Sequence, residues 1–122
     1  MNNNKQFSLS NRIKSFGFAI EGIITFFRTQ HNAWIHAVAA ITVIISGFIF
    51  KVNSYDWCLL IIAITLVIVS EMLNTAIEFL TDLASPGFNL LAKKVKDVAA
   101  GAVLISAIAA VVIGLFVFLS KI

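Results

Sequence analysis

Four polar side chains recur at helical spacing within an apolar stretch of the sequence. They are Glu71, Asn74, Glu78 and Asp82, separated by 3, 4 and 4 residues, so on a helix they share one face. If that helix starts at a membrane surface near Trp57, Glu71 lies about 21 Å inward, still within a hydrocarbon core of roughly 30 Å. A carboxylate there costs about 2.5 kcal/mol or more, which predicts a functional group that faces protein or water.

The order of the carboxylates along this helix predicts two different partners. Glu71 and Glu78 lie about 10 Å apart along the axis, too far to share one metal ion readily. Glu71 can meet a group presented from the lipid, whereas Glu78 and Asp82 can meet a polar ligand from the cytoplasm. The pattern suits a reaction between a lipid head group and a soluble donor. In the structural alternative, a protonated Glu71 and Asn74 only form hydrogen bonds between helices, and the other two carboxylates lie at a solvated helix end.

A second polar cluster precedes the last apolar segment. Lys93, Lys94 and Lys96 stand just before a predicted helix start, and amines combined with a helix amino terminus form a site for phosphate. A polyphosphate is the ligand that this cluster suits. In the alternative interpretation the lysines only anchor the helix at anionic head groups, and Asp97 caps its first turn.

Composition and charge spacing identify the segments that hold these residues. Of 122 residues, 60% are hydrophobic and 12% are charged, against about 25% charged in soluble domains. Charged residues are absent between positions 29 and 50 and between 98 and 120, and Glu71 is the only one between 57 and 77. The chain is therefore predicted to be an all-α membrane protein with one domain. Its three transmembrane helices are expected at about 33–50, 57–80 and 98–120.

An amphipathic helix is predicted ahead of the first span, at about residues 8–30, where Ser8 or Ser10 can cap it. Its apolar and polar residues separate onto two faces, as in a helix that lies in the membrane interface. The apolar face consists of Ile13, Phe16, Ile20, Ile23, Ile24 and Phe27, and the polar face of Asn11, Lys14, Glu21, Thr25 and Arg28.

Basic residues predict the orientation. Seven of the nine, including Lys5, precede the first or third span, and only Lys51 and Lys121 fall on the other side. This bias places the amino terminus and the 83–97 loop in the cytoplasm. Trp34 is then expected at the inner interface. Tyr55 and Trp57 are expected in the outer aromatic belt.

Several classes of function are excluded or left without support. The net charge of +3 is small and scattered, which argues against nucleic-acid binding. Cys58 is the single cysteine, so no intrachain disulfide can form. The sequence contains no GxxxxGK[ST] or GxGxxG motif. His31 and His36 lie five residues apart, poorly spaced for a shared metal, and are expected at the inner interface.

A ridge of small residues marks the third span. It consists of Ala102, Ser106, Ala110 and Gly114, which recur every four residues. Small residues let another helix backbone approach closely in a membrane. The third helix is therefore expected to pack tightly, either within the chain or between subunits.

Two runs of sequence resemble the prokaryotic diacylglycerol kinase family, and the resemblance extends from Arg12 to the end of the chain. They are Glu71-x-x-Asn74-Thr-Ala-Ile-Glu78-x-x-x-Asp82 and Leu91-Ala92-Lys93-x-x-Lys96-Asp97-x-Ala99-Ala100-Gly101-Ala102-Val103-Leu104. The Asn-Thr-Ala-Ile-Glu and Ala-Ala-Gly-Ala runs look more like the undecaprenol kinase branch than the enterobacterial diacylglycerol kinases.

The resemblance implies a homotrimeric kinase of the bacterial inner membrane, with active sites shared between subunits at the cytoplasmic face. Such an enzyme transfers the γ-phosphate of MgATP to a lipid hydroxyl. By position, Glu71 corresponds to the general base and Asn74 to a polar partner near the transferred phosphate. Glu78 corresponds to a ligand of Mg²⁺ and also lies with the residues around the nucleotide, which are Asp82, Lys96 and Asp97.

This sequence departs from the family pattern at Gln30, where the family usually has a glutamate that serves as a second metal ligand. Gln30 can still ligate Mg²⁺ through its carbonyl oxygen, with one negative charge fewer, so weaker metal binding is expected. Glu21 is a less favoured substitute, because it lies two and a half helical turns away.

Three hypotheses remain open from the sequence. The leading one is a lipid kinase acting on undecaprenol, with diacylglycerol as the alternative acceptor. The second is a noncatalytic membrane oligomer, such as a small channel, in which Glu71 and Asn74 line a pore. The third is a relative that is inactive because of Gln30.

Overall fold

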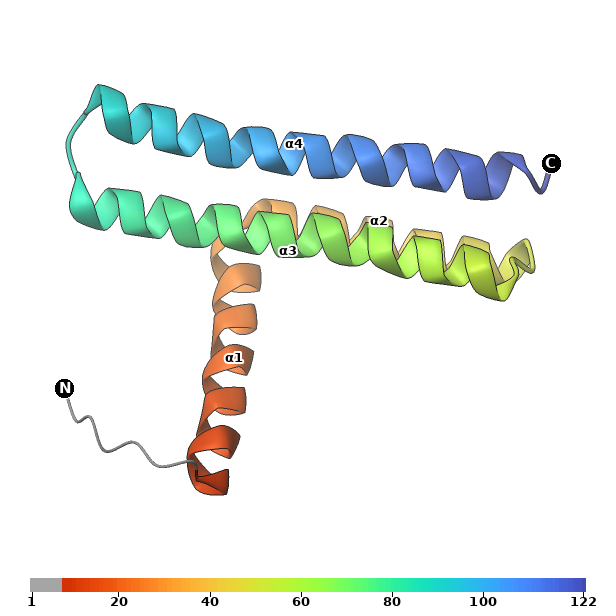
Figure 1. The fold of residues 1–122 in the computed structure, drawn as a ribbon, viewed down its shortest axis with the longest axis horizontal. Helices are drawn as coiled ribbons and strands as arrows, with labels where there is room; N and C mark the ends of the chain where they lie inside the picture. Colours follow the sequence, from red (N-terminus) through yellow and green to blue (C-terminus); the bar gives the residue numbers. More distant parts are fainter. Residues whose placement is uncertain (1–7) are drawn as a thin grey trace.

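The computed structural model describes residues 8–122, so Lys5 lies outside the described part of the chain. Within that part, three long helices run lengthwise and a fourth runs crosswise to them from the start of α2 (Figure 1). The helices are α1 (Leu9–Thr29), α2 (His31–Ile49), α3 (Ser54–Ala84) and α4 (Leu90–Leu119). The predicted all-α architecture, with one amphipathic helix before three apolar ones, is confirmed.

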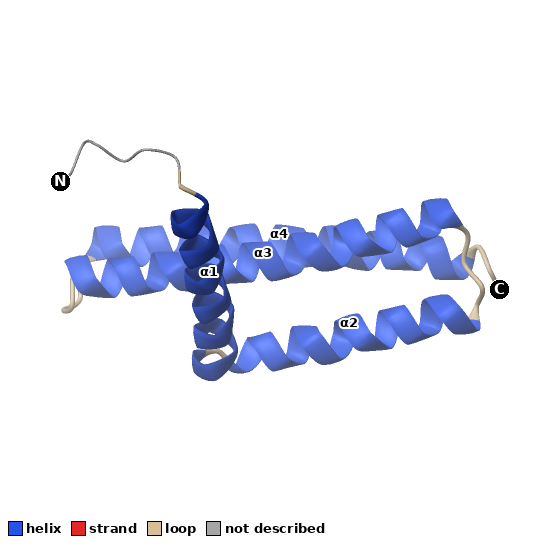
Figure 2. Cartoon of the chain, turned by 90° about the horizontal axis from the view of Figure 1, so that it is seen from below, coloured by secondary structure: helices blue, strands red, loops and turns tan. Residues whose placement is uncertain are grey.

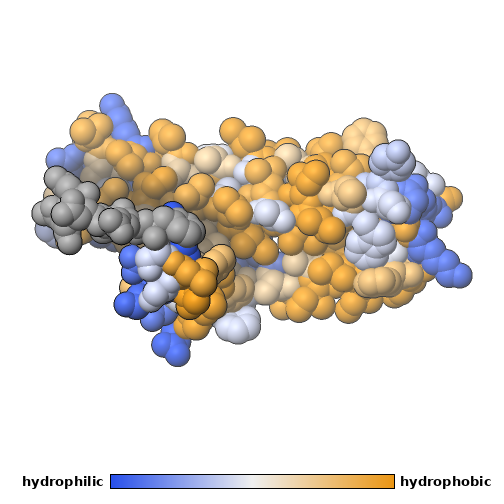
Figure 3. Space-filling view, turned by 60° about the horizontal axis from the view of Figure 1, so that its bottom comes forward, coloured by the Kyte–Doolittle hydropathy of each residue, from blue (hydrophilic) through white to orange (hydrophobic). Residues whose placement is uncertain are grey.

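Helices α2, α3 and α4 are each long and apolar enough to cross a membrane. Large apolar side chains cover their surfaces, including Ile62, Ile105 and Phe116, which are all exposed. Hydrophilic residues gather toward the two ends, with a largely hydrophobic band between them (Figure 3). Such a surface is explained by contact with lipid, since exposing so much apolar area to water would be strongly unfavourable.

The start of α4 corrects one prediction. The sequence interpretation left residues 83–97 as a loop, but α4 begins at Leu90 and only the short segment 85–89 connects it to α3. Asn89 caps this start, since its side-chain oxygen accepts hydrogen bonds from the amides of Leu91 and Ala92 at 2.8 and 3.2 Å. Asp97 is therefore not the cap. At 30 residues α4 is about 45 Å long, so a helix can extend beyond the hydrocarbon and carry lysines there.

The other helix ends also have simple local causes. Ser8 accepts a hydrogen bond from the amide of Asn11, as predicted, and Asn53 caps α3 through the amide of Asp56. Between α2 and α3 the chain turns through Lys51, whose φ of 54° lies in the left-handed region. The amide of Val52 bonds back to the carbonyl of Gly47, which closes the end of α2 in a Schellman-type turn.

Helices α3 and α4 form an antiparallel pair that lies side by side and in contact (Figure 1). A cluster at the turn end holds this pair together through Val52, Leu60 and Val117. The ion pair of Lys121 with Asp56, at 3.3 Å, joins the end of α4 to the start of α3. These contacts fix the register of the two helices.

The small-residue ridge on α4 is used only in part within the chain. Ser106 is buried, but Ala102 is exposed, and no neighbouring atom lies within 4 Å of where a Cβ on Gly114 would stand. The close approach of another backbone at Gly114 is therefore not made by this chain itself.

Helix α2 lies apart from the α3–α4 pair along much of its length (Figure 2). An apolar cavity of about 430 Å³ lies among the three helices. It is bordered by small residues such as Ala40 on α2, Ala63 on α3 and Ala110 on α4, and His36 is the polar residue in its wall.

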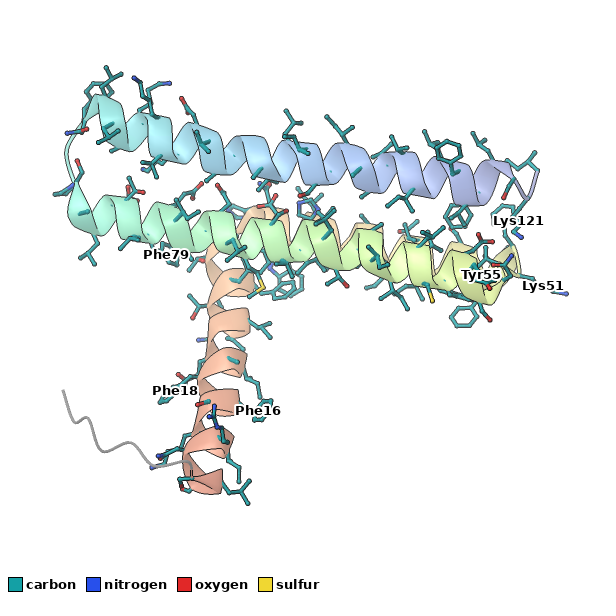
Figure 4. The ribbon with its side chains drawn as sticks, in the orientation of Figure 1. Phe16, Phe18, Lys51, Tyr55, Phe79 and Lys121 are labelled. Carbon is teal, nitrogen blue, oxygen red and sulfur yellow. The ribbon has the colours of Figure 1, made fainter. Side chains whose placement is uncertain are left out.

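The elbow between α1 and α2 is held by one tryptophan. Gln30 ends α1 and begins α2 in an extended conformation, so the chain changes direction at that residue. The Trp34 indole N–H donates a 2.8 Å hydrogen bond to the carbonyl of Phe27, and the two rings pack edge to face. Lys51, Tyr55 and Lys121 lie at the opposite end of the molecule (Figure 4).

Candidate active site

Apart from Gln30, the predicted site residues lie on α3 and α4, toward the end at which α1 joins the bundle. The end of the α3–α4 hairpin continues past the level of α1 (Figure 1), and Phe79 lies on that projecting part (Figure 4). Glu78 precedes Phe79 directly, so it belongs to the same part of α3. If α1 lies in the membrane interface, this hairpin end is in water.

Glu71 is buried in an apolar part of α3, with 6% of its surface exposed. Its carboxylate Oε1 lies 2.9 Å from Nε2 of His36 on α2. The Glu71 backbone carbonyl also accepts a 3.0 Å hydrogen bond from Thr75 Oγ1, within α3. The predicted membrane carboxylate thus faces another protein side chain, which is what its desolvation requires.

One helical turn further, Asn74 and Glu78 contact each other. The Asn74 amide Nδ2 donates a 3.0 Å hydrogen bond to Glu78 Oε1. The other amide atom, Asn74 Oδ1, is buried and has no hydrogen-bond partner among the described residues. A buried acceptor without a partner costs free energy, and a ligand or water can satisfy it.

The remaining charged site residues pair at the hairpin end. Lys96 Nζ on α4 lies 2.6 Å from Asp82 Oδ1 on α3, so this ion pair joins the two helices. Lys93 and Asp97, one turn apart on α4, form a second pair at 2.6 Å. All four side chains are more than 40% exposed, so their charges are accessible to a ligand from solution.

Gln30 stands at the elbow, away from these pairs in sequence. Its side-chain amide donates a 3.3 Å hydrogen bond to Thr29 Oγ1. In residues 8–122 no three His, Cys, Asp or Glu side chains come together as a metal site. The predicted ligands, Glu78 and Gln30, include an amide and so form a different kind of donor set. Joining these two ligands in one site remains a prediction.

Sequence reasoning missed His36 as a site residue. It placed His36 at the membrane interface because the spacing from His31 excluded a shared metal. The sequence does show His36 as a polar side chain within an apolar span. It does not show that Glu71 is its partner, because no spacing rule links residues 35 positions apart on two helices whose packing is unknown.

The comparisons with known proteins agree on one kind of protein. Residues 17–118 match the family described as prokaryotic diacylglycerol kinase. An undecaprenol kinase from Bacillus subtilis is 41% identical over 113 residues, which cover 93% of this chain and 92% of that protein. A diacylglycerol kinase from Synechocystis sp. is 39% identical over 105 residues, which cover 85% of this chain and 60% of that protein.

Proposed function

Because this chain belongs to the prokaryotic diacylglycerol kinase family, we propose that it is a membrane kinase that phosphorylates undecaprenol from MgATP at the cytoplasmic face of the bacterial inner membrane. The observation that carries this proposal is the line of polar groups along α3. It runs from the buried carboxylate of Glu71 to the exposed carboxylate of Asp82. This line of polar groups can therefore contact a lipid acceptor at its buried end and a soluble nucleotide at its exposed end.

Glu71 acts as the general base. The lipid hydroxyl oxygen forms a bond to the γ-phosphorus, the bond from that phosphorus to the bridging oxygen of ADP breaks, and the hydroxyl proton passes to the Glu71 carboxylate. Phosphoryl transfer of this kind needs mainly positioning and charge stabilisation, and one group to receive the proton. Burial of Glu71 keeps water from competing with the lipid as acceptor.

Glu78, Asn74 and Gln30 together would offer oxygen donors that suit a magnesium ion. Mg²⁺ prefers oxygen ligands, and the carboxylate of Glu78, the unpartnered Oδ1 of Asn74 and the amide oxygen of Gln30 are all oxygen donors. When bound, the ion neutralises charge on the phosphates of ATP. The role of Glu78 is to hold the ion. Asn74 holds the Glu78 carboxylate through its amide N–H and stands close to the transferred phosphate.

The hairpin end holds the nucleotide. Lys96 supplies an ammonium group to the phosphates, while Asp82 and Asp97 fix the positions of Lys96 and Lys93 through the two ion pairs. An ammonium group is a strong donor to phosphate oxygens. Both lysines stand in the first two turns of α4, near its positive end.

We also propose that the active enzyme is a homotrimer with shared active sites. Within one chain, no atom lies within 4 Å of the Cβ position of Gly114, and the apolar cavity among α2, α3 and α4 is lined in part by alanines. Helices of a second and third copy would complete this packing, because small residues allow close contact between helices in a membrane.

Undecaprenol is favoured over diacylglycerol by the relative that matches most of both chains, which is named for undecaprenol. The test is to purify the chain in mixed lipid and detergent micelles and to supply each lipid in turn with MgATP. The proposal predicts a higher kcat/KM with undecaprenol. A higher value with diacylglycerol would assign the alternative acceptor, and no transfer to either by the folded protein would indicate an inactive relative.

A further inference from the structure

The contact between His36 and Glu71 joins two elements at the centre of the proposed site. His36 is on α2 and Glu71 on α3, 35 residues later, and the 2.9 Å separation between Nε2 and Oε1 is that of a hydrogen bond. The side chains are 23% and 9% exposed, so both are largely withdrawn from solvent. Because the two residues are on different helices and far apart in the sequence, the contact does not arise from local helix geometry.

We propose that His36 is a positioning residue for Glu71 in phosphoryl transfer, an inference that rests on the function proposed above. An ionised carboxylate can only accept hydrogen bonds, so the imidazole Nε2–H donates to Oε1. That bond fixes the rotamer of the Glu71 side chain. It occupies Oε1 and leaves Oε2 to receive the proton of the lipid hydroxyl.

The surroundings of His36 explain why the carboxylate needs this partner. The wall of the 430 Å³ cavity is otherwise apolar, and His36 borders it while Glu71 does not. The imidazole therefore borders the cavity and also contacts the carboxylate. Without it, Glu71 would face an apolar space with no donor from α2, where a charged carboxylate is strongly disfavoured.

The same contact could serve stability alone, as an ordinary hydrogen bond between membrane helices. Such a bond adds little to stability on average, and its loss would leave turnover by the folded enzyme unchanged. A base that loses its orientation behaves differently, because a misplacement of about 1 Å can lower the rate about 100-fold. Turnover therefore separates the two roles.

The experiment compares His36→Gln with His36→Met in purified protein with undecaprenol and MgATP. The two replacements have similar length and flexibility, but only glutamine offers an N–H donor at the position of Nε2. We expect kcat of the Met variant to fall about 10- to 100-fold with KM for MgATP nearly unchanged, and the Gln variant to recover most of the loss. Thr42→Val is the control, since the Thr42 hydroxyl donates to the carbonyl of Val38 within α2, and its loss should leave kcat unchanged.

A wild-type kcat in the folded Met variant, or equal losses in the Met and Gln variants, would overturn the proposed role of His36. Infrared spectroscopy gives a second readout that needs no turnover. The carboxylate stretch that disappears in Glu71→Gln should shift between the Met and Gln variants, and an identical band in both would also count against the contact. If the unchanged chain transfers phosphate to neither lipid, the proposed function itself fails.

Discussion

Lys96 on α4 and Asp82 on α3 lie 2.6 Å apart and join the two helices at the end of their hairpin. The two side chains are 41% and 63% exposed, and an ion pair open to solvent adds little to stability because water and salt screen it. Its effect is on placement. Asp82 holds the Lys96 ammonium in place at the solvent-exposed end of the α3–α4 hairpin.

Replacing Lys96 with methionine should weaken nucleotide binding. The change keeps the length of the side chain but removes the charge that is proposed to contact phosphate. We expect KM for MgATP to rise about tenfold, with a smaller change in kcat at saturating MgATP. Initial rates over a range of MgATP concentrations at saturating lipid give both constants.

Lys51→Gln is the matched control, because it also removes one positive charge but stands at the opposite end of the molecule (Figure 4). Its KM should equal that of the unchanged protein. Equal increases in both variants would mean that overall charge, rather than a contact at Lys96, governs nucleotide affinity.

Replacing Gln30 with glutamate should lower the Mg²⁺ requirement. A carboxylate binds this hard cation more strongly than an amide oxygen does. We expect half-maximal activity at a several-fold lower free Mg²⁺ concentration, measured by titration at constant ATP. Gln30→Leu removes the oxygen donor and should move the requirement the other way.

An Mg²⁺ requirement that is the same in the Glu, Leu and unchanged proteins would remove Gln30 from the metal site. It would leave Gln30 with the structural role that its position suggests, as the residue that ends α1 and begins α2.

Replacing Gly47 with alanine should destabilise the fold at the turn between α2 and α3. A Cβ at this position would lie 2.6 Å from Cη2 of Trp57, whose ring also packs against Phe48. Relieving this overlap requires the indole to move, and we expect a loss of about 1–3 kcal/mol in unfolding free energy. Thermal or denaturant unfolding in micelles measures it.

Gly22→Ala is the comparison for that change. Gly22 lies on α1 with open space around its Cβ position, and alanine favours a helix over glycine. Its stability should be equal or higher. A loss as large as that of Gly47→Ala would show that the contact with Trp57 is not the cause.

Replacing Gly114 with leucine tests the assembly. The new side chain has room within the chain, so the fold should persist, but it would obstruct another helix at the small-residue ridge. We expect the mass of the complex, measured by light scattering with correction for detergent, to fall from that of a trimer. An unchanged trimer mass would place the interface elsewhere.

Much of the fold could be predicted from the sequence because a helix that crosses a membrane must be long and almost free of charged residues. Gaps between charged residues located α2 and α3, and the polar face of the first helix located α1. The start of α4 was wrong by several residues. The prediction assumed that the helix starts where the charged residues stop. Instead α4 starts directly after its cap, Asn89, and carries its lysines in turns that can lie beyond the hydrocarbon.

The candidate site could be predicted only where its residues share one helix. Spacing placed Asn74 and Glu78 on one helix face, and in the structure a hydrogen bond joins them. The partners of Glu71 and Asp82 lie on other helices, and neither His36 nor the pairing of Lys96 followed from periodicity. Contacts between helices depend on rotation and register, which sequence spacing within one helix does not contain.

The most direct test of the account is phosphoryl transfer and nucleotide binding by Glu71→Gln, measured on the same folded preparation. Glutamine keeps the shape of the side chain but cannot take up a proton as a carboxylate does. The account predicts that transfer to undecaprenol falls at least about 100-fold while the dissociation constant for MgATP stays close to that of the unchanged protein. Transfer at the original rate, or loss of transfer and binding together, would contradict the role of Glu71 as the base.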